Sequence, residues 1–311
     1  MSELQFINFL ASSVRMATPL LLASLGLVIS ERSGLINIGV EGIMLMAAFA
    51  GYAGSKLAGG YWYGLIVAIL VSMVIISIFA VTTIKYKSQQ VIIGAALNMF
   101  CAGLSSFLYR LIFYNTGRFD EGIAAASFPN VSIPVLSKIP ILGPVFFNHN
   151  LLVYFSYIMV IVLWIVINKT SIGLKVIAAG EHPKAAESLG INVIHVRYLA
   201  TLFSGVMMGV AGAYLSIAQA SSFGEDMTSG RGFIAMAVVI LGKWSPIGSM
   251  FGALFFGAAT ALQLMFQITG VEIPRNVIMM IPYIATVIAV LAVSQNKVGA
   301  PSALGVPYEK S

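Results

Sequence analysis

The chain has 311 residues, of which 59% are hydrophobic and only 9% charged, with a formal net charge of +6 at pH 7. This composition excludes a soluble domain and is typical of a polytopic membrane protein. The basic residues are scattered and form no stripe, so we expect no nucleic-acid binding; the single cysteine, Cys101, excludes a disulfide framework.

Uncharged runs recur along the chain, and a helix needs about 20 residues to span the hydrocarbon core of a bilayer. The alternation of a β-barrel is missing, so the spans are expected to be helices. We therefore predict an all-α polytopic membrane protein with about nine transmembrane helices. The nine segments are Ile7–Ser30, Ile36–Lys56, Tyr63–Ile84, Val91–Ile112, Leu151–Asn168, Tyr198–Ala220, Gly232–Gly242, Ser245–Ile268 and Asn276–Ser294.

The second segment follows Ser33-Gly34 and carries two polar side chains, Asn37 and Glu41, about one helical turn apart. A carboxylate at membrane depth is costly unless it is paired or faces water. Glu41 is therefore a candidate functional residue, with an anchoring or capping role near the interface as the alternative.

Small residues at helical spacing mark the sixth segment, where Gly205, Gly209 and Gly212 follow one another along one face. Such residues allow helix backbones to approach closely. We expect tight packing of this helix inside the bundle.

The seventh segment is short, with 11 uncharged residues between Arg231 and Lys243. It is expected to be a short, broken or re-entrant helix, and short glycine-interrupted segments often mark a transport path. Ser229-Gly230 before it echoes Ser33-Gly34 before the second segment. Four crossings, one linking helix and four more crossings would form two inverted repeats.

Lysine and arginine residues define the orientation, because cytoplasmic loops are enriched in them. The basic stretches are Lys85 with Lys87, then Lys169, Lys175, Lys184 and Arg197, and finally Lys297 with Lys310. The expected organisation is a first membrane repeat (1–112), an extracytoplasmic loop (113–148), a linking transmembrane helix (149–168), a cytoplasmic coupling-helix loop (169–197), a second membrane repeat (198–296) and a cytoplasmic tail (297–311).

The loop 169–197 contains a short predicted helix. Pro183 suits its first position and Gly190 its C-terminal cap. Two turns of helix are too short to be stable alone in water, so the helix must dock on something. A partner protein is the favoured surface, and the cytoplasmic face of the same chain is the alternative. The residues expected at this contact are Glu181, His182, Pro183, Ala185, Ala186, Leu189 and Gly190.

A phosphate-binding loop of the form Gly-x4-Gly-Lys-Ser/Thr does not occur in the sequence. If ATP drives this protein, another chain must bind ATP and Mg²⁺, and we expect no cofactor here. The three histidines form no metal-ligand pair and no Ser-His-Asp grouping can be placed, so no catalytic residue is expected.

Two stretches of sequence resemble bacterial ATP-binding-cassette (ABC) importer permeases of the simple-sugar, nucleoside and branched-chain amino-acid group. They are Ser-Gly-Leu-Ile-Asn-Ile-Gly-Val-Glu-Gly-Ile-Met-Leu at 33–45 and Gly-Glu-His-Pro-Lys-Ala-Ala-Glu-Ser-Leu-Gly-Ile-Asn at 180–192. The Asn-Ile-Gly-Val-Glu-Gly form is similar to the nucleoside (guanosine) type, whereas sugar and branched-chain amino-acid permeases show other forms at this place.

The resemblance implies a permease that forms half of a nucleoside path across the bacterial cytoplasmic membrane. It also implies three partners: an ATPase subunit, a second, usually longer permease, and a lipid-anchored substrate-binding protein. The helix Pro183–Leu189 matches the coupling helix of the family, in which Asn often stands where His182 stands here. The positive-inside rule places the C-terminal tail in the cytoplasm if the seventh segment crosses the membrane.

Asn37, Glu41, Asn98 and Ser229 are the polar side chains expected along the substrate path, since a nucleoside needs hydrogen-bond partners. Whether Glu41 meets the substrate or pairs within the protein stays open at this point. The alternatives to a nucleoside permease are a simple-sugar or branched-chain amino-acid permease and an ion-coupled secondary transporter. The last of these would need more membrane-embedded acidic residues than Glu41 alone.

Overall fold

The computed structural model describes residues 3–114, 127–134, 136–268, 277–278, 280–294 and 299–309. Within these ranges the chain is almost entirely helical, with one pair of three-residue antiparallel strands. The elements are α1 (Glu3–Arg32), α2 (Val40–Ala58), α3 (Tyr61–Ala80), η1 (Val81–Lys85), α4 (Gln90–Tyr109), η2 (Arg110–Tyr114), β1 (Asn130–Ser132), η3 (Leu136–Lys138), α5 (Leu142–Phe146), β2 (Asn148–Asn150), α6 (Leu151–Lys169), α7 (Ser171–Glu181), α8 (Pro183–Ser188), α9 (Val193–Ala213), η4 (Tyr214–Gln219), α10 (Arg231–Leu241), α11 (Pro246–Ile268) and α13 (Ile281–Ser294).

Six of the described helices are long and apolar enough to cross a membrane. They are Gln5–Arg32, Tyr61–Lys85, Gln90–Phe113, Leu151–Lys169, Val193–Gln219 and Pro246–Gln267. The expected class of multi-pass helical membrane protein is confirmed. The expected nine crossings are not reached by length and composition, because α2 is not among the six, α10 is short, and the ninth predicted segment lies partly outside the described residues.

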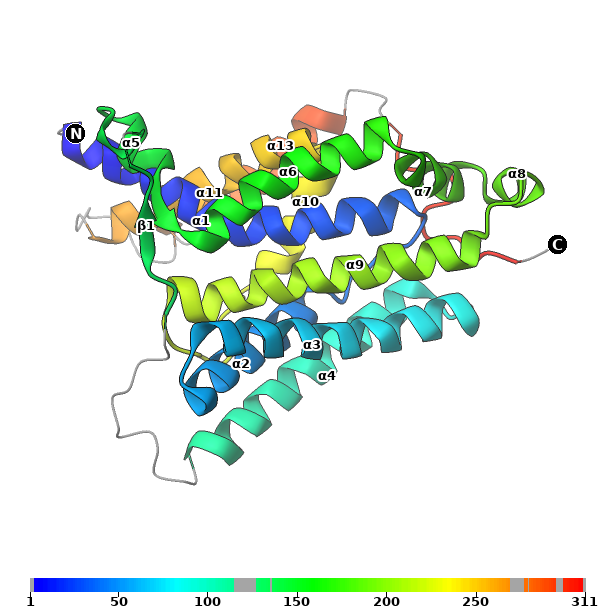
Figure 1. Ribbon diagram of the computed structural model, residues 1–311, viewed down its shortest axis with the longest axis horizontal. Helices are drawn as coiled ribbons and strands as arrows, with labels where there is room; N and C mark the ends of the chain where they lie inside the picture. Colours follow the sequence, from blue (N-terminus) through cyan, green and yellow to red (C-terminus); the bar gives the residue numbers. More distant parts are fainter. Residues whose placement is uncertain are drawn as a thin grey trace.

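The long helices α1, α6 and α9 run side by side, and the bundle has two ends (Figure 1). One end carries α7, α8 and the C-terminal segment, and we call it the α8 end. The opposite end carries β1 and α5, and we call it the β1 end. The α8 loop thus lies at one end of the bundle, and α2 lies nearer the β1 end (Figure 1).

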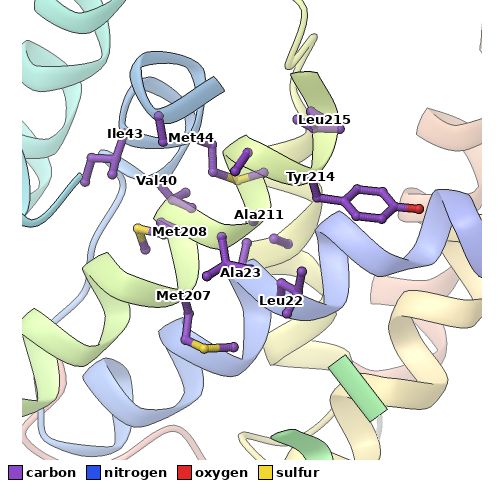
Figure 2. Close-up of a cluster of buried hydrophobic side chains, with 14 of the residues drawn as sticks. Leu22, Ala23, Val40, Ile43, Met44, Met207, Met208, Ala211, Tyr214 and Leu215 are labelled. Atoms are coloured by element: carbon purple, nitrogen blue, oxygen red, sulfur yellow. The ribbon is translucent and has the colours of Figure 1, made fainter. Parts of the chain in front are cut away.

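The centre of the bundle is packed where α1, α2 and α9 meet. Figure 2 shows Leu22 and Ala23 of α1, Ile43 and Met44 of α2, and Met207 and Met208 of α9 gathered in one cluster. Within a membrane, close van der Waals packing of such side chains helps to hold the helices together.

The expected close packing of the sixth segment is confirmed by the glycines of α9. A Cβ added to Gly205 would lie 2.3 Å from Ile76, and one added to Gly212 would lie 2.4 Å from the Met44 carbonyl oxygen. The carbonyl of Gly205 accepts a hydrogen bond of 2.8 Å from the Ser72 hydroxyl. The backbone of α9 is therefore in direct contact with α2 and α3.

The loop 169–197 contains two helices where the sequence predicted one. Thr170 accepts a hydrogen bond from Gly173 N–H and so caps the start of α7, which the sequence analysis did not foresee. Asn192 accepts one from His195 N–H and starts α9 at Val193, five residues before the predicted Tyr198. Both boundaries follow from side-chain caps that satisfy free N–H groups at a helix start.

Two non-helical segments enter the bundle from opposite ends. Residues 33–39 leave α1 at the α8 end and lead to the start of α2. Residues 220–230 leave η4 at the β1 end and lead to the start of α10, whose 11 residues rise only about 16 Å, roughly half of a hydrocarbon core. The chain between Gln219 and Trp244 thus passes from one end to the other partly without helix.

Candidate functional site

Glu41 binds the start of α10, an element almost 200 residues away in the sequence. Its two carboxylate oxygens accept hydrogen bonds of 2.8 Å from Gly230 N–H and 2.6 Å from Gly232 N–H. The first N–H groups of a helix have no partner inside the helix and carry its partial positive charge. Glu41 supplies the missing acceptors and the complementary charge, so it caps α10 from α2.

Asn98 and Asn37 hold the segment before α2 in place. The Asn98 amide donates to Ile38 O at 2.9 Å and accepts from Gly42 N–H at 2.8 Å. The Asn37 oxygen accepts from Gly39 N–H at 2.9 Å, and its amide nitrogen lies 3.7 Å from the Met208 sulfur. These side chains replace the backbone partners that a continuous helix would provide.

Glycines allow three elements to meet around these side chains. A Cβ on Gly42 would lie 2.7 Å from Asn98 Cα, and a Cβ on Gly232 would lie 2.7 Å from Glu41 Cα. We call this meeting point of α2, α4 and α10 the junction, formed by Asn37, Gly39, Glu41, Gly42, Asn98, Gly230 and Gly232. Three of the four predicted path residues lie in it.

Ser229, the fourth predicted path residue, lies at the edge of the junction. Its hydroxyl donates to Asp226 O at 2.9 Å and its side chain is exposed. It stands directly before Gly230 but makes none of the described contacts to Glu41. The structure therefore brings together Asn37, Glu41 and Asn98, with Ser229 beside them.

A second contact between the halves of the chain lies at the other end of α10. Trp244 Nε1 donates to the Glu31 carboxylate at 2.6 Å, and its carbonyl accepts from Arg32 Nε at 2.6 Å. The sequence analysis did not predict this contact. The signal available was an acidic residue beside a basic one at the end of an apolar span, which does not reveal a partner more than 200 residues away.

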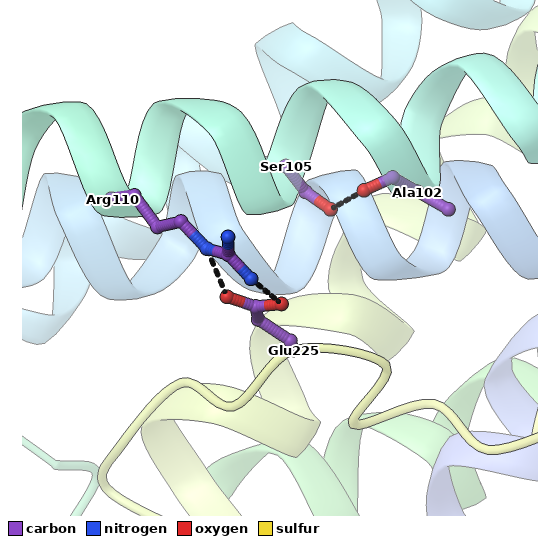
Figure 3. Close-up of polar contacts among 4 residues, drawn as sticks. All are labelled: Ala102, Ser105, Arg110 and Glu225. Carbon is purple, nitrogen blue, oxygen red and sulfur yellow. Dashed lines mark hydrogen bonds and ion pairs between the residues drawn. The ribbon is translucent and has the colours of Figure 1, made fainter.

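At the β1 end the segment 220–230 is fixed by an ion pair and by aromatic rings. Arg110 contacts the Glu225 carboxylate through two nitrogens, at 2.8 and 2.9 Å (Figure 3). This pair lowers the pKa of Glu225 below its ordinary value, chiefly through the hydrogen bond. The buried Phe223 ring lies 5.5 Å from Phe49 and 5.0 Å from Tyr109. Residues 220–230 are thus held against α2 and the end of α4 in the first half of the chain.

The helix predicted to contact a partner lies at the α8 end of the bundle (Figure 1). Pro183 occupies its first turn and Gly190 follows it with φ +82°, as predicted. Leu189 is 81% exposed, and His182 and Ala185 are exposed too. Ala186 is only 2% exposed and packs inside the chain with Ala179 and Val193. The exposed face of α8 therefore includes Leu189 and Ala185 but not Ala186.

The other predicted contact residues surround α8. His182 precedes Pro183 without a side-chain hydrogen bond to the helix start. The Glu181 carboxylate accepts from the Ser302 hydroxyl at 2.8 Å, so it is engaged by the C-terminal segment.

An apolar groove of about 800 Å³ lies between α6, α7 and α9, with Leu189 and Gly190 at its edge. Its walls include Leu163, Val176 and Leu199. It contains none of the predicted path residues. In the parts of the chain that the structure describes, no group of three or more histidine, cysteine, aspartate or glutamate residues could hold a metal ion.

A family model matches residues 9–298 of the chain, and its description is the permease component of the branched-chain amino acid transport system. The guanosine ABC transporter permease protein NupQ of Bacillus subtilis is 37% identical, over 94% of this chain and 94% of its own length. The nucleoside ABC transporter permease protein NupC of Lactococcus lactis is 38% identical, over 95% of this chain and 94% of its own length.

Other relatives are more distant or cover less of the chain. The putative glucose ABC transporter permease protein TsgC13 of Haloferax volcanii is 37% identical over 86% of this chain and 80% of its own length. The second guanosine permease of Bacillus subtilis, NupP, is 23% identical over 81% of this chain and 72% of its own length. No solved structure matches the chain.

Proposed function

This chain belongs to the family of permease components described for branched-chain amino acid transport, and from this premise we propose that it is a membrane permease subunit of an ABC importer for nucleosides. The observation that carries the proposal is the similarity to NupQ and NupC, which extends over at least 94% of this chain and of each relative. The subunit moves substrate and is not an enzyme.

The occurrence of two permeases in each of two organisms supports a second permease as a partner of this chain. Bacillus subtilis has the guanosine permeases NupQ and NupP, and Lactococcus lactis has the nucleoside permeases NupC and NupB. This chain aligns with NupQ over 94% of its length and with NupC over 95%. It covers only 72% of NupP and 67% of NupB, the longer permease of each pair. The proposed assembly pairs this chain with a second, longer permease, an ATPase subunit and a lipid-anchored substrate-binding protein.

The proposed location is the bacterial cytoplasmic membrane, with the α8 end and the C-terminal segment in the cytoplasm. The exposed Leu189 and Ala185 support α8 as the docking element for the ATPase, since a helix of six residues is too short to be stable alone in water. ATP and Mg²⁺ belong to the ATPase in this scheme.

The proposed path follows the junction. Two non-helical segments that enter from opposite ends and meet at helix starts support an inverted-repeat arrangement, which typically places the transport path between the halves. The hydrogen bonds of Glu41, Asn37 and Asn98 are used by the backbone, which supports a role in shaping the path rather than in direct substrate contact. The α10 passage supports nine crossings, with the seventh partly non-helical.

Alternating access then requires the two halves to move relative to each other at the contacts around α10. Different side chains would line the path in the outward-facing and inward-facing states, and α8 would move together with the ATPase. This chain provides the gate and the ATPase the energy.

A sugar permease is the second candidate, and the similarity to TsgC13 favours it specifically. Deleting the gene and measuring uptake of radiolabelled guanosine, uridine and glucose by the cells separates the candidates. The proposal expects at least a tenfold loss of nucleoside uptake with glucose uptake unchanged, restored by the gene on a plasmid. Loss of glucose uptake alone would refute the nucleoside assignment.

A further inference from the structure

The C-terminal segment 299–309 lies along the α8 end of the bundle and contacts elements from both halves of the chain (Figure 1). It has no helix of its own beyond turns at 302–305. An extended segment without secondary structure keeps one position only if other elements satisfy its polar groups. Here hydrogen bonds to α7, α8, α9 and residues 33–34 hold the segment in place.

The segment binds the end of α7 and the last turn of α8. Ala303 N–H donates to Gly180 O at 2.8 Å, and Ser302 donates to the Glu181 carboxylate through its hydroxyl at 2.8 Å and its N–H at 3.2 Å. Farther along, the Tyr308 hydroxyl donates to the Glu187 carboxylate. Since six residues of helix do not hold their own position in water, these contacts help to define where α8 lies.

The same segment binds residues 33–34, which begin the path toward the junction. Gly305 N–H donates to Gly34 O at 3.0 Å. Gly34 has φ +99°, and a Cβ there would lie 2.6 Å from Arg197 Nη2. Only glycine fits between the C-terminal segment and Arg197 at this place.

Arg197 connects these parts from α9. Its side chain is 2% exposed and donates from Nε to Ser33 O at 3.0 Å and from Nη1 to Val306 O at 3.1 Å. Its guanidinium carbon lies 5.7 Å from the centre of the Tyr308 ring. The planar guanidinium fixes the directions of its donors, so the 33–34 backbone and the C-terminal segment are held at one distance from each other.

A last contact reaches the turn between α3 and α4. Lys87 forms an ion pair of 2.8 Å with Glu309, and this pair lowers the pKa of the Glu309 carboxyl below its ordinary value. Both side chains are well exposed, so this pair adds little holding strength. The buried Arg197 and the α8 contacts therefore define the unit.

We propose that Arg197 and the segment 299–309 act as a positioning unit that makes α8 and residues 33–39 move together, so that displacement of α8 by the ATPase reaches Glu41 and α10. The series of contacts begins with Tyr308 on α8 and Ser302 on the end of α7. It continues through the C-terminal segment to Arg197 and Ser33, and from there along eight residues to Glu41. This inference rests on the proposed function and adds the route by which the energy of ATP reaches the gate.

The test uses the complete transport complex in proteoliposomes and measures labelled guanosine taken up per ATP hydrolysed. Three variants are compared: truncation after Val298, Tyr308→Phe and Arg197→Lys, with the exposed Val306→Ala as matched control. We expect the ratio to fall at least fivefold in the truncation and at least twofold in the point variants. Co-purification of the ATPase and its maximal ATPase rate stay within twofold of wild type, and Val306→Ala leaves the ratio unchanged.

The ratio of guanosine taken up to ATP hydrolysed is compared with that of a wild-type complex that transports guanosine. An unchanged ratio in the variants therefore counts against the positioning unit and not against nucleoside transport. An unchanged ratio in the truncated complex would overturn the proposal. Loss of ATPase co-purification in the truncation would overturn it as well, because the segment would then be a docking surface. If the truncated chain does not insert, unchanged ratios in both Tyr308→Phe and Arg197→Lys would have the same consequence.

Discussion

The Glu41 carboxylate is used for a contact within the protein, between α2 and the start of α10. Both of its oxygens accept N–H groups at the start of α10, and the side chain is 9% exposed. A hydrogen bond to a charged group contributes about 1.5–3 kcal/mol, more than one between neutral groups. The charge and the two oxygens both matter, because a helix start attracts negative charge.

Replacing Glu41 with Gln tests this role. The amide has only one oxygen, and its NH₂ group would face a backbone N–H, so one contact at the start of α10 is lost. We expect a loss of about 1.5–3 kcal/mol in the free energy of unfolding and at least a tenfold loss of ATP-coupled uptake, with assembly intact. Thermal unfolding and proteoliposome uptake measure these effects, with the exposed Glu3→Gln as control. Unchanged uptake in an intact complex would exclude an essential role for the charge.

Tyr308 allows a prediction about pH. Desolvation and the hydrogen bond to Glu187 raise the pKa of this phenol from 10.0 to about 12. A raised pKa means that the hydroxyl proton is fully present below the ordinary value and is lost only as the pH rises through about 12. The transport deficit of Tyr308→Phe should therefore be the same at pH 7 and pH 9. A deficit that disappears at pH 9 would show that the contact with Glu187 is already lost there.

At the scale of elements, α10 is held at both of its ends, by Glu41 at its start and by Glu31 and Arg32 beyond its end. Its first turn packs so closely on α2 that only glycine fits at position 232. Both clamps join this helix of 11 residues to α1 and α2 in the first half of the chain. Any relative movement of the two halves must therefore alter one of the clamps.

The close contact at Gly232 provides a matched pair of variants. Alanine at this position puts a Cβ 2.7 Å from the Glu41 backbone, so α10 must shift, and overpacking of this kind costs about 1–3 kcal/mol. Gly103→Ala is the control, because nothing lies within 4 Å of its Cβ and alanine favours the helix. We expect thermal unfolding at lower temperature and reduced uptake for Gly232→Ala only. Equal behaviour of the two variants would contradict the described packing.

The α8 contact is tested by Leu189→Asp. A buried aspartate at an apolar contact without a partner is strongly unfavourable, so we expect loss of ATPase co-purification and of uptake, with normal membrane insertion. Leu142→Asp is the control, since this leucine is 51% exposed and belongs to α5 at the β1 end. Normal co-purification of the ATPase with Leu189→Asp would remove the docking argument.

Local signals in the sequence predicted the elements well. Pro183 and Gly190 bound α8, and the glycines of α9 lie at its close contacts, because turns, caps and small residues act over a few positions. The start of α7 was missed because its cap, Thr170, follows the long apolar α6 without a break. Asn37, Glu41 and Asn98 were selected for their polarity in an apolar setting, and the structure brings them together.

Partners across the chain could not be predicted in this way. The bonds from Glu41 to Gly230, from Trp244 to Glu31 and from Arg197 to Val306 join residues more than 100 positions apart. A single sequence contains no periodicity or spacing that reveals such pairs. For the same reason, the sequence could not show that Glu41 binds the start of α10.

At the scale of the whole molecule, a series of contacts connects the α8 end with the junction inside the bundle. The α8 end offers an exposed contact surface, the C-terminal segment and Arg197 join it to residues 33–39, and the junction joins both halves of the chain. An equilibrium between two states of the proposed gate shifts only if the ATPase binds them with different affinity. On the proposed function, we therefore expect that the chain alone does not concentrate substrate.

Reconstitution in proteoliposomes tests whether the chain needs its partners and ATP to concentrate nucleoside. The purified chain is placed in proteoliposomes alone or with the second permease, the ATPase and the binding protein, and labelled guanosine accumulation is measured with ATP, without ATP, and with an imposed proton or sodium gradient. We expect guanosine to accumulate above its external concentration only with the complete complex and ATP. Accumulation by the chain alone, driven by an ion gradient, would contradict it.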